Sequence, residues 1–406
     1  MRSIVLAAAL ALGITSLASA QARFGGPDAV ENQLAEDERD VTPLFELSFL
    51  EPYREWKAGI QEKTGLHFGG DYSAVGFVGS GDFGDDEAAG GMVRFFGTWD
   101  LVDRGGDHPG ALVWKVEHRH AYTNVAPSGF GFEKGYVGLL GPPFSDQRWR
   151  TTNLYWRQRV DGGRFALIGG FLDATDYVDA YAFASPWTGF TNLVFSTGSG
   201  TIPLPNDALL GIAAGGMVTE NVYAMVGFGD ANGDPEHPFD GFESVFDEHE
   251  FFSSVEIGWT SSHDRLVLDN VHLTAWHIDA RSAAGTPSGW GVNVSASWQI
   301  AERWQPFLRA GWAKDGGSLL DRAVAVGVGY ATFGGRDLLA AAIHWGRPNE
   351  DTYGRLDDQW TLEVFYRWQV LREVTVTPDL QILVDPAQNP DDSLVVVLGL
   401  RVRIAL

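Results

Sequence analysis

The last residues of the chain alternate strictly between two kinds of side chain. In a β-strand, one face would carry Leu400, Val402, Ile404 and Leu406, and the other Arg401, Arg403 and Ala405. An arginine placed in hydrocarbon near the middle of a bilayer costs about 2–4 kcal/mol, so the arginine face must meet water. The two faces therefore predict a strand of a transmembrane β-barrel, with lipid on one side and a polar lumen on the other.

The same period of two recurs along most of the chain, in segments separated by turn residues. We expect sixteen strands, at about 66–79, 90–103, 110–123, 148–160, 164–173, 207–219, 221–231, 248–261, 265–281, 289–300, 303–314, 320–332, 336–347, 356–370, 373–385 and 392–405. Single-chain bacterial barrels close with an even number of strands. The sequence thus predicts an all-β fold, a closed transmembrane antiparallel barrel that makes a water-filled pore.

The connections between these strands alternate in length. The short ones are expected to be periplasmic turns, at 103–109, 161–163, 219–220, 262–264, 301–302, 333–335 and 371–372. The long ones are expected to be extracellular loops, at 80–89, 124–147, 174–206, 232–247, 282–288, 315–319, 348–355 and 386–391. The loop at 174–206 is the longest, and we expect it to fold inward and narrow the lumen because loops of such length usually have a function.

The chain before the first strand divides into three parts. Residues 1–20 have the pattern of a secretory signal peptide, with an apolar run that ends in a small-residue cleavage site. Residues 21–45 are acidic and are expected to be flexible. The barrel domain at 46–406 starts with a short amphipathic helix within 43–64, which Thr64 and Gly65 would stop. We expect this helix to plug or line the periplasmic mouth.

Composition excludes several classes of protein. The formal net charge of −24 argues against a nucleic-acid partner, which requires a basic surface. No later segment has the 18 consecutive apolar residues that indicate a transmembrane helix, and the absence of cysteine leaves no disulfides to stabilise an exported chain. Acidic clusters at 82–87 and 247–250 would favour solubility, or bind divalent cations near lipopolysaccharide.

Strand parity selects the side chains that face the lumen. Lys115 and Glu117, for example, alternate with the apolar Trp114. The predicted pore-lining residues are Arg94, Lys115, Glu117, Arg119, Arg157, Arg159, Glu363, Arg367, Asp379, Gln381, Arg401 and Arg403 from the strands, and Trp187 and Asn192 from the long loop. Mixed charge suits neutral, hydroxyl-rich solutes, because arginine donates to their hydroxyl groups and carboxylates accept from them. Alternatively, these charges only pair across strands and keep the barrel round.

Catalytic and metal-binding patterns are weak. Gly198-Ser199-Gly200 lacks the spacing of a nucleophile elbow, and no pair of carboxylates is fixed at hydrolytic distance. His118 and His120 share the outward face, which favours a girdle or cross-strand role over a metal site. The run from Asp230 to Asp234 resembles the start of a calcium loop but departs from the EF-hand pattern. We therefore expect no enzyme and no cofactor, with a loop-bound divalent cation as an open alternative.

Several strings of the chain resemble the carbohydrate-selective porin family, often called OprB-like. They are Thr377-Pro378-Asp379-Leu380-Gln381 with Val384-Asp385-Pro386 and Asn389-Pro390, Gly399-Leu400-Arg401-Val402-Arg403, and the run from Ile168 to Asn192. The helix between Trp56 and Gly65 is a looser match, so the resemblance covers about 45–406. The chain departs from the family at Leu406, where the family commonly ends in Phe, and in lacking the family's tryptophan-glycine string in the helix.

The resemblance implies passive, sugar-selective diffusion through the outer membrane of a Gram-negative bacterium, with arginines among the charges at the constriction. The implied partners are small carbohydrates, outer-membrane lipid and lipopolysaccharide, and the barrel-assembly machinery, with the chain acting as a monomer or a homotrimer. The residues themselves leave other possibilities open. These are a general or anion-selective porin, an outer-membrane barrel enzyme such as a lipase, and a structural barrel.

Overall fold

A computed structural model describes residues 24–39, 42–46 and 48–406 of the chain. The signal peptide predicted at 1–20 lies outside the described residues. Among the helices of the described part, none is long and apolar enough to cross a membrane.

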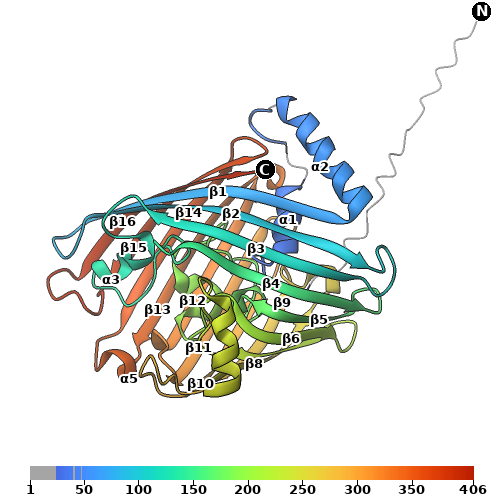
Figure 1. Cartoon of the computed structure of the whole chain (residues 1–406). Helices are drawn as coiled ribbons and strands as arrows, with labels where there is room; N and C mark the ends of the chain where they lie inside the picture. Colours follow the sequence, from blue (N-terminus) through green and yellow to red (C-terminus); the bar gives the residue numbers. More distant parts are fainter. Residues whose placement is uncertain (1–23, 40–41, 47) are drawn as a thin grey trace, which may run out of the picture.

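The described chain forms a closed barrel of sixteen antiparallel strands (Figure 1). The strands are β1 (Leu66–Gly79), β2 (Glu87–Val102), β3 (Gly110–Ala121), β4 (Arg148–Val160), β5 (Phe165–Leu172), β6 (Leu209–Met217), β7 (Val222–Asp230), β8 (Phe251–Thr260), β9 (Asn270–Ile278), β10 (Gly289–Ser297), β11 (Trp304–Asp315), β12 (Leu320–Thr332), β13 (Asp337–Pro348), β14 (Gln359–Gln369), β15 (Val374–Val384) and β16 (Leu394–Ala405). Each strand pairs with its neighbours in sequence, and β1 pairs with β16 to close the barrel. The predicted fold class and strand number are confirmed.

The connections divide the barrel into two ends. Short turns join β2 to β3 and every second pair after it, and we call this side the turn end. Longer segments join the remaining pairs at the opposite side, which we call the loop end. Because β16 runs from the loop end to the turn end, the C-terminus lies at the turn end, near α2 (Figure 1). The predicted alternation of short and long connections is present over most of the barrel, but the loop-end connection 316–319 is shorter than the turn-end connection 261–269.

Short helices lie in the connections and before β1. The α-helices are α1 (Val30–Asp37), α2 (Glu51–Thr64), α3 (Phe130–Glu133), α4 (Gly241–Glu243) and α5 (Glu350–Tyr353). The other helical turns are η1 (Ser48–Leu50), η2 (Pro127–Gly129), η3 (Ala174–Asp176), η4 (Leu193–Phe195), η5 (Thr197–Gly200), η6 (Pro238–Asp240), the π-type η7 (Ser244–Glu248), η8 (His263–Arg265) and η9 (Phe333–Gly335).

The two faces of each strand differ as the alternation predicts. On β16, Leu398 and Leu400 are 59% and 51% exposed, whereas Arg401 and Arg403 are 1% and 6% exposed. A row of large apolar side chains that is exposed on the outside of a protein would be unfavourable in water. The outer wall is therefore suited to hydrocarbon, and the polar side chains point inward.

The segment before β1 differs from the predictions. Residues 21–45 were expected to be flexible, but α1 lies within them and packs inside the barrel, where Val30 and Leu34 are buried against Phe96 and Val113. An acidic segment orders here because basic side chains of the wall offer it partners, as described below.

The amphipathic helix expected within 43–64 is present as α2. It ends at Gly65, which has φ 75° and whose N–H donates to the carbonyl of Gln61 at 2.8 Å. This left-handed conformation suits glycine because it has no Cβ. However, α2 lies on the outside of the turn end (Figure 1) and does not plug the mouth. The segment that enters the lumen is α1.

The connection between β5 and β6, residues 173–208, folds into the barrel as expected and forms much of its interior. We call this connection the inner loop. Its aromatic residues Tyr181, Phe183 and Phe190 are buried with Phe307 on β11 and Phe365 on β14. The centre of the barrel at this level is therefore a packed core that spans from one wall to the inner loop.

Candidate pore-lining site

The inner loop is attached to the wall formed by β9 and β11 through the carboxylate of Asp179. Asp179 is fully buried, forms an ion pair with Arg309 and lies 2.8 Å from Nε2 of His272. It also accepts a hydrogen bond from the backbone N–H of Gly198 at 2.8 Å. Burial alone would raise the pKa of Asp179, but Arg309 and His272 outweigh it and hold this pKa below its ordinary value. The carboxylate is thus a charged anchor for two separate parts of the inner loop.

A second attachment joins the inner loop to β14, β15 and β16. Glu363 accepts hydrogen bonds from the backbone N–H groups of Thr191 and Asn192, at 2.6 and 3.1 Å. Gln381 donates to the hydroxyl of Thr191 at 2.8 Å, and Arg401 donates to the carbonyl of Gly189 at 2.8 Å. These wall side chains satisfy buried backbone groups of a loop that has no regular secondary structure at this point.

Helix α1 is attached to the wall by its acidic side chains. Glu31 forms ion pairs with Arg157 and Arg159 on β4. At the other end of the helix, Asp37 forms two hydrogen bonds with Arg403 on β16, at 2.6 and 2.8 Å. Three arginines that face the lumen are therefore neutralised by a segment that lies before the first strand.

Arg94 connects this cluster with the inner loop. Its guanidinium donates to Asp71 on the neighbouring strand, with one contact at 2.8 Å, and lies 4.2 Å from the ring centroid of Trp187. Asp71 also accepts from Arg403 at 2.6 Å. Burial alone favours neutral forms, but two guanidiniums on one carboxylate keep such a cluster charged.

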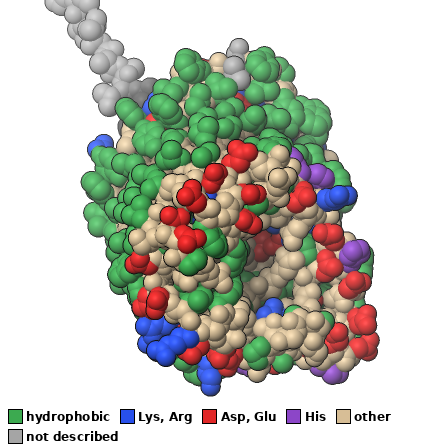
Figure 2. Space-filling model, turned by 90° about the vertical axis from the view of Figure 1, so that its left-hand side faces the viewer, with side chains coloured by type: hydrophobic (Ala, Val, Ile, Leu, Met, Phe, Trp, Pro, Cys, Tyr) green, Lys and Arg blue, Asp and Glu red, His purple; other side chains and the backbone are tan. Residues whose placement is uncertain are grey.

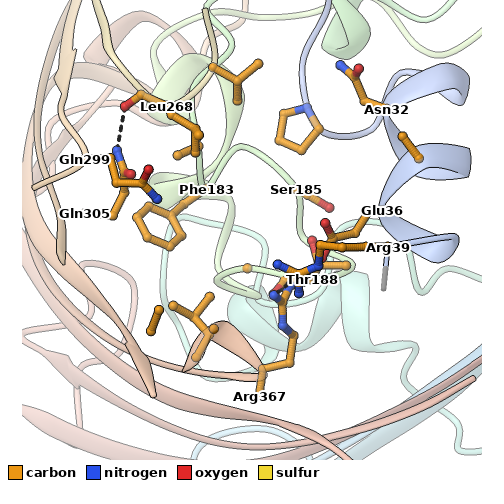
Figure 3. Close-up of a pocket in the computed structure, with 18 of the residues that line it drawn as sticks. Asn32, Glu36, Arg39, Phe183, Ser185, Thr188, Leu268, Gln299, Gln305 and Arg367 are labelled. Carbon is orange, nitrogen blue, oxygen red and sulfur yellow. Dashed lines mark hydrogen bonds and ion pairs between the residues drawn. The ribbon is translucent and has the colours of Figure 1, made fainter. Parts of the chain in front are cut away.

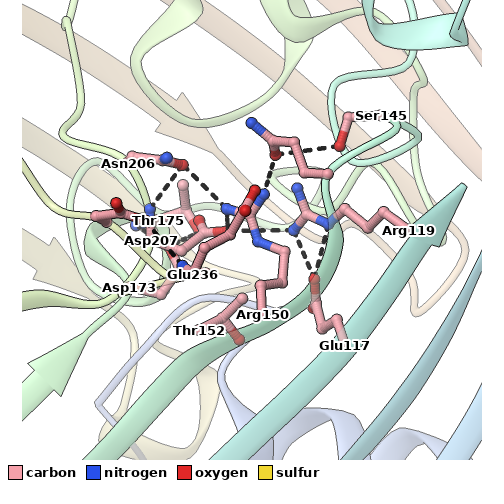
Figure 4. A network of polar contacts seen from close by, with 12 residues as sticks. Glu117, Arg119, Ser145, Arg150, Thr152, Asp173, Thr175, Asn206, Asp207 and Glu236 are labelled. Carbon is pink, nitrogen blue, oxygen red and sulfur yellow. Dashed lines mark hydrogen bonds and ion pairs between the residues drawn. The ribbon is translucent and has the colours of Figure 1, made fainter. Parts of the chain in front are cut away.

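A third cluster of polar contacts lies on the loop-end side of the inner loop (Figure 4). Asp207, just before β6, accepts from Arg119 at 3.1 Å and from Arg150 at 2.7 Å, and Arg119 also forms an ion pair with Glu117. Burial alone would raise the pKa of Asp207, but the two guanidiniums and Lys115 lower it below its ordinary value. Asp207 is therefore an anion that holds two cations at one side of the lumen.

Lys115 lies deeper in the same cluster, between two further carboxylates. Its Nζ is 3.4 Å from Asp173 and 3.8 Å from Asp176. Burial raises the pKa of Asp176 to about 8, and the charge of Asp173 adds to this effect. The single positive charge of Lys115 can neutralise only one of the two buried carboxylates Asp173 and Asp176. A proton on Asp176 near neutral pH would neutralise the other.

On the turn-end side of the inner loop, the lumen contains a cavity of about 500 Å³. Helix α1, the inner loop and the turns after β8, β10 and β12 surround it (Figure 3). Polar side chains line it together with Phe183, among them Asn32, Glu36, Ser185, Gln299 and Arg367. Arg367 donates to the carbonyl of Thr188 at 3.3 Å, while its buried Nε atom has no hydrogen-bond partner. The cavity therefore offers both donors and acceptors.

The loop end of the barrel is hollowed at its centre (Figure 2). Acidic side chains lie around the hollow and inside it, and basic side chains are fewer on this face. The excess of carboxylates at the mouth agrees with the net charge of the chain. It would attract cations and repel anions over about a Debye length, roughly 8 Å at physiological salt.

The structure brings the predicted pore-lining residues into three groups. The α1 group contains Arg94, Arg157, Arg159, Arg367 and Arg403; the inner-loop group contains Trp187, Asn192, Glu363, Asp379, Gln381 and Arg401; the loop-end group contains Lys115, Glu117 and Arg119. Those that lie on strands have the inward orientation that strand parity predicts, and Trp187 and Asn192 lie in the inner loop inside the barrel. Whether they contact a solute remains a prediction, since most of them have partners within the chain.

Sequence reasoning missed the residues that complete these groups. They are Glu31, Asp37, Asp71, Arg150, Asp179, Asp207, His272 and Arg309. Parity of the strands would have selected Asp71, His272 and Arg309. The acidic residues of α1 and the inner loop carried no such signal, because nothing in their own pattern shows that they lie in the lumen.

The absence of a metal site and of catalytic groups stays a prediction. Among the described residues, Asp234, His237 and Asp240 in the connection between β7 and β8 could each direct one ligand atom to a common point. They are exposed or half-buried, and a loop-bound divalent cation stays a prediction. His118 and His120 face outward, where His118 packs against Trp149 and His120 lies near Tyr72.

A closed sixteen-stranded barrel with a polar interior and one long loop folded inward defines a porin. The profile of the carbohydrate-selective porin, OprB family, matches residues 105–406. The chain belongs to this family. Family and fold together indicate a carbohydrate-selective channel, and they imply the outer membrane as its location.

Solved structures support the fold. The high-pH structure of OprB from Pseudomonas putida is 17% identical, with a TM-score of 0.69 over 87% of this chain and 97% of that one. The low-pH structure of the same protein is 13% identical, with a TM-score of 0.52 over 90% of this chain and 100% of that one. A porin mutant from Rh. blastica is 12% identical, with a TM-score of 0.50 over 84% and 100%. No protein of curated function matches the chain in sequence.

Proposed function

We propose that the chain admits small neutral sugars by passive diffusion past the inner loop, in the outer membrane of a Gram-negative bacterium. The loop end would face the outside and the turn end the periplasm. The single observation that carries this proposal is the attachment of the inner loop to both walls of the lumen, through Asp179 on one side and Glu363 on the other. A fixed constriction of this kind limits passage by size while leaving polar groups along the remaining path.

The proposed path has two polar stations. Solutes would meet the cluster of Glu117, Arg119 and Asp207 first, and the cavity beside α1 second. A sugar presents many hydroxyl groups, each of which donates and accepts, so surfaces with interspersed cations and carboxylates can replace its water. An anion channel would instead need rings of unpaired basic residues, whereas most arginines of this lumen, such as Arg157, Arg159 and Arg403, are paired with carboxylates.

Among the cavity residues, Arg367 is the best candidate for direct contact with a sugar. Its guanidinium lines the cavity and is held by Thr188 and by Glu36, the latter at 3.7 Å. The unpartnered Nε atom is a buried donor, and such a donor gains free energy when a ligand supplies an acceptor. Phe183 in the same cavity offers an apolar surface for a sugar ring.

Further partners follow from the same proposal. Outer-membrane lipid would cover the apolar wall, lipopolysaccharide would lie near the acidic loops, and the barrel-assembly machinery would insert the chain. The chain would function as a monomer or a homotrimer. The apolar outer wall is suited both to contact with lipid, as in a monomer, and to contact between subunits, as in a homotrimer.

Reconstitution into planar bilayers tests the proposal. The purified protein should give a stable conductance, and the addition of glucose or a maltodextrin should reduce the current in a saturable way. A barrel that conducts without being blocked by any sugar would leave a general porin, and a barrel that does not conduct would refute the pore. Arg367→Ala should weaken sugar block, whereas Arg347→Ala, which removes an arginine bound to Asp358 away from the cavity, should not.

A further inference from the structure

Helix α2 carries an apolar stripe that the described chain leaves largely exposed. Phe49, in the turn directly before the helix, and Tyr53, Trp56 and Ile60 follow one another at spacings of four, three and four residues, which places them on one side of a helix. Phe49 is 72% exposed and Trp56 is 55% exposed. Phe45, slightly earlier in the chain, is 66% exposed.

The opposite side of α2 is acidic. Glu51, Glu55 and Glu62 lie on it and are all exposed. A helix with one apolar side and one charged side is suited to a boundary between hydrocarbon and water. Such a helix would be poorly accommodated either in bulk water or inside the barrel.

The orientation of α2 is fixed by contacts between the helix and the rim of the barrel. Arg54 forms an ion pair with Glu373 in the turn between β14 and β15, and Lys57 lies 3.6 Å from Glu38. At the C-terminal end of the helix, Arg104 donates to the carbonyl of Thr64 at 2.7 Å. Because both ends are held, the exposed stripe does not result from a helix that swings freely.

The stripe is continuous with the outer wall of the barrel. The ring of Trp56 packs edge-on against Phe68, at 6.0 Å between centroids, and Phe68 lies on the outward face of β1. Trp99, an exposed residue on the outward face of β2, donates from its indole to the carbonyl of Thr64 at 3.2 Å. Tryptophans at the ends of barrel strands typically lie at the level of the membrane interface.

We propose that α2 is an interfacial helix whose stripe of Phe49, Tyr53, Trp56 and Ile60 is buried in the phospholipid leaflet at the turn end of the barrel, while its glutamates face water. The occupant of the apolar surface is lipid, because the stripe continues the surface that lipid already covers on β1 and β2. The inference rests on the membrane location proposed above. It adds to the barrel a lateral contact with one leaflet that the strands do not provide.

Site-directed spin labelling in vesicles of zwitterionic phospholipid tests this inference. The chain has no cysteine, so each single-cysteine variant carries one nitroxide. Phe49→Cys and Ile60→Cys probe the stripe, Glu55→Cys and Glu62→Cys are the matched controls on the acidic side, and Leu400→Cys probes the lipid-facing wall. Labels on the stripe and at position 400 should collide more often with oxygen than with a water-soluble nickel chelate, and labels on the acidic side should show the reverse.

The controls separate the possible failures. If the label at position 400 meets lipid while both stripe labels meet the nickel chelate, the interfacial helix is refuted and the membrane barrel stands. If the label at position 400 also meets water, the membrane location itself fails. Spin–spin broadening between stripe labels that disappears on dilution with unlabelled protein would assign the stripe to a second copy of the chain and would also overturn the inference.

Discussion

Glu363 accepts hydrogen bonds from both the backbone N–H and the hydroxyl of Thr191, at 2.6 and 3.2 Å, across a sequence separation of 172 residues. A side chain of β14 thereby holds the middle of the inner loop in position. Glu363→Ala would leave buried N–H groups without an acceptor, which costs about 1–3 kcal/mol per group. We expect a less stable protein with a larger and noisier single-channel current.

Single-channel recording and thermal unfolding in detergent would measure the two effects of Glu363→Ala. Glu350→Ala is the control, because Glu350 is exposed at the start of α5. An unchanged current in a less stable variant would mean that the inner loop keeps its position without Glu363.

Helix α1 should behave as a removable plug that depends on charge. The double variant Glu31→Gln and Asp37→Asn weakens the ion pairs with Arg157, Arg159 and Arg403, so the helix should leave the lumen. Conductance should rise, and the reversal potential in a salt gradient should shift toward anions, because the released arginines then face the path.

The matched control for α1 changes two glutamates of α2 in the same way. Glu55→Gln with Glu62→Gln alters the net charge equally but outside the lumen, and should leave the current unchanged. Equal shifts in both double variants would attribute the effect to net charge alone.

Asp207 should control ion selectivity at the loop end. Asp207→Asn removes the carboxylate that Arg119 and Arg150 share, so Arg150 loses its carboxylate partner and Arg119 keeps only Glu117. The permeability ratio should shift toward chloride in a potassium chloride gradient. Asp391→Asn, in an exposed position between β15 and β16, should cause a smaller shift or none. A ratio identical to that of the unmodified protein would remove this cluster from the path.

On the lipid-facing side of β16, the loss of stability caused by an introduced charge should depend on its depth in the membrane. Leu400→Arg, near the middle of the strand, should destabilise the folded barrel by about 2–4 kcal/mol, and Leu394→Arg, at its loop end, by about 0–1 kcal/mol. Both leucines are exposed on the outer wall, so the comparison isolates depth. Unfolding in urea with the protein in lipid vesicles provides the measurement, and equal costs would contradict the assigned membrane position.

Because of Asp28, the stability with which the N-terminal segment packs inside the barrel should depend on pH. Burial raises its pKa from 3.8 to about 6, although Ser185 donates to it at 2.5 Å. The folded state therefore binds this proton more tightly than the unfolded chain. The contribution of Asp28 to stability is full below pH 3.8 and is lost as the pH rises through about 6.

Hydrogen exchange of residues 24–37 measures this effect. After correction for intrinsic exchange, protection should be greater at about pH 5 than at about pH 7.5, and Asp28→Asn should abolish the difference. A pH dependence that survives in Asp28→Asn would assign it to other groups.

The barrel was predictable because the pattern that indicates each strand lies within the sequence of that strand. Outward leucines and inward arginines alternate in β16 itself, so the strand, its faces and its place in a closed barrel follow without knowledge of any distant residue. The pairing of these arginines was not predictable in the same way. Arg403 meets Asp37 and Arg401 meets Gly189, and both partners lie in segments without a strand pattern.

The N-terminal segment shows where composition misleads. An acidic stretch of low hydrophobicity usually stays disordered in water because it cannot bury enough apolar surface. Inside a lumen that presents Arg157, Arg159 and Arg403, the same acidity becomes the reason for order. Only the assembled barrel contains this basic environment, so no window of sequence around α1 could reveal it.

The position of α1 also bears on how the cylinder holds together. Glu31 reaches β4 while Asp37 reaches β16, and Arg403 on β16 also binds Asp71 on β1. The line between β1 and β16 is where the first and last strands of the chain meet, and a cylinder that opened sideways would part there. Helix α1 crosses the junction between β1 and β16 on the inside of the barrel and adds ion pairs to the backbone hydrogen bonds there. The N-terminal helix therefore helps to hold the C-terminal strand in place. The described fold is then complete only when α1, which precedes every strand in the chain, lies inside the closed barrel.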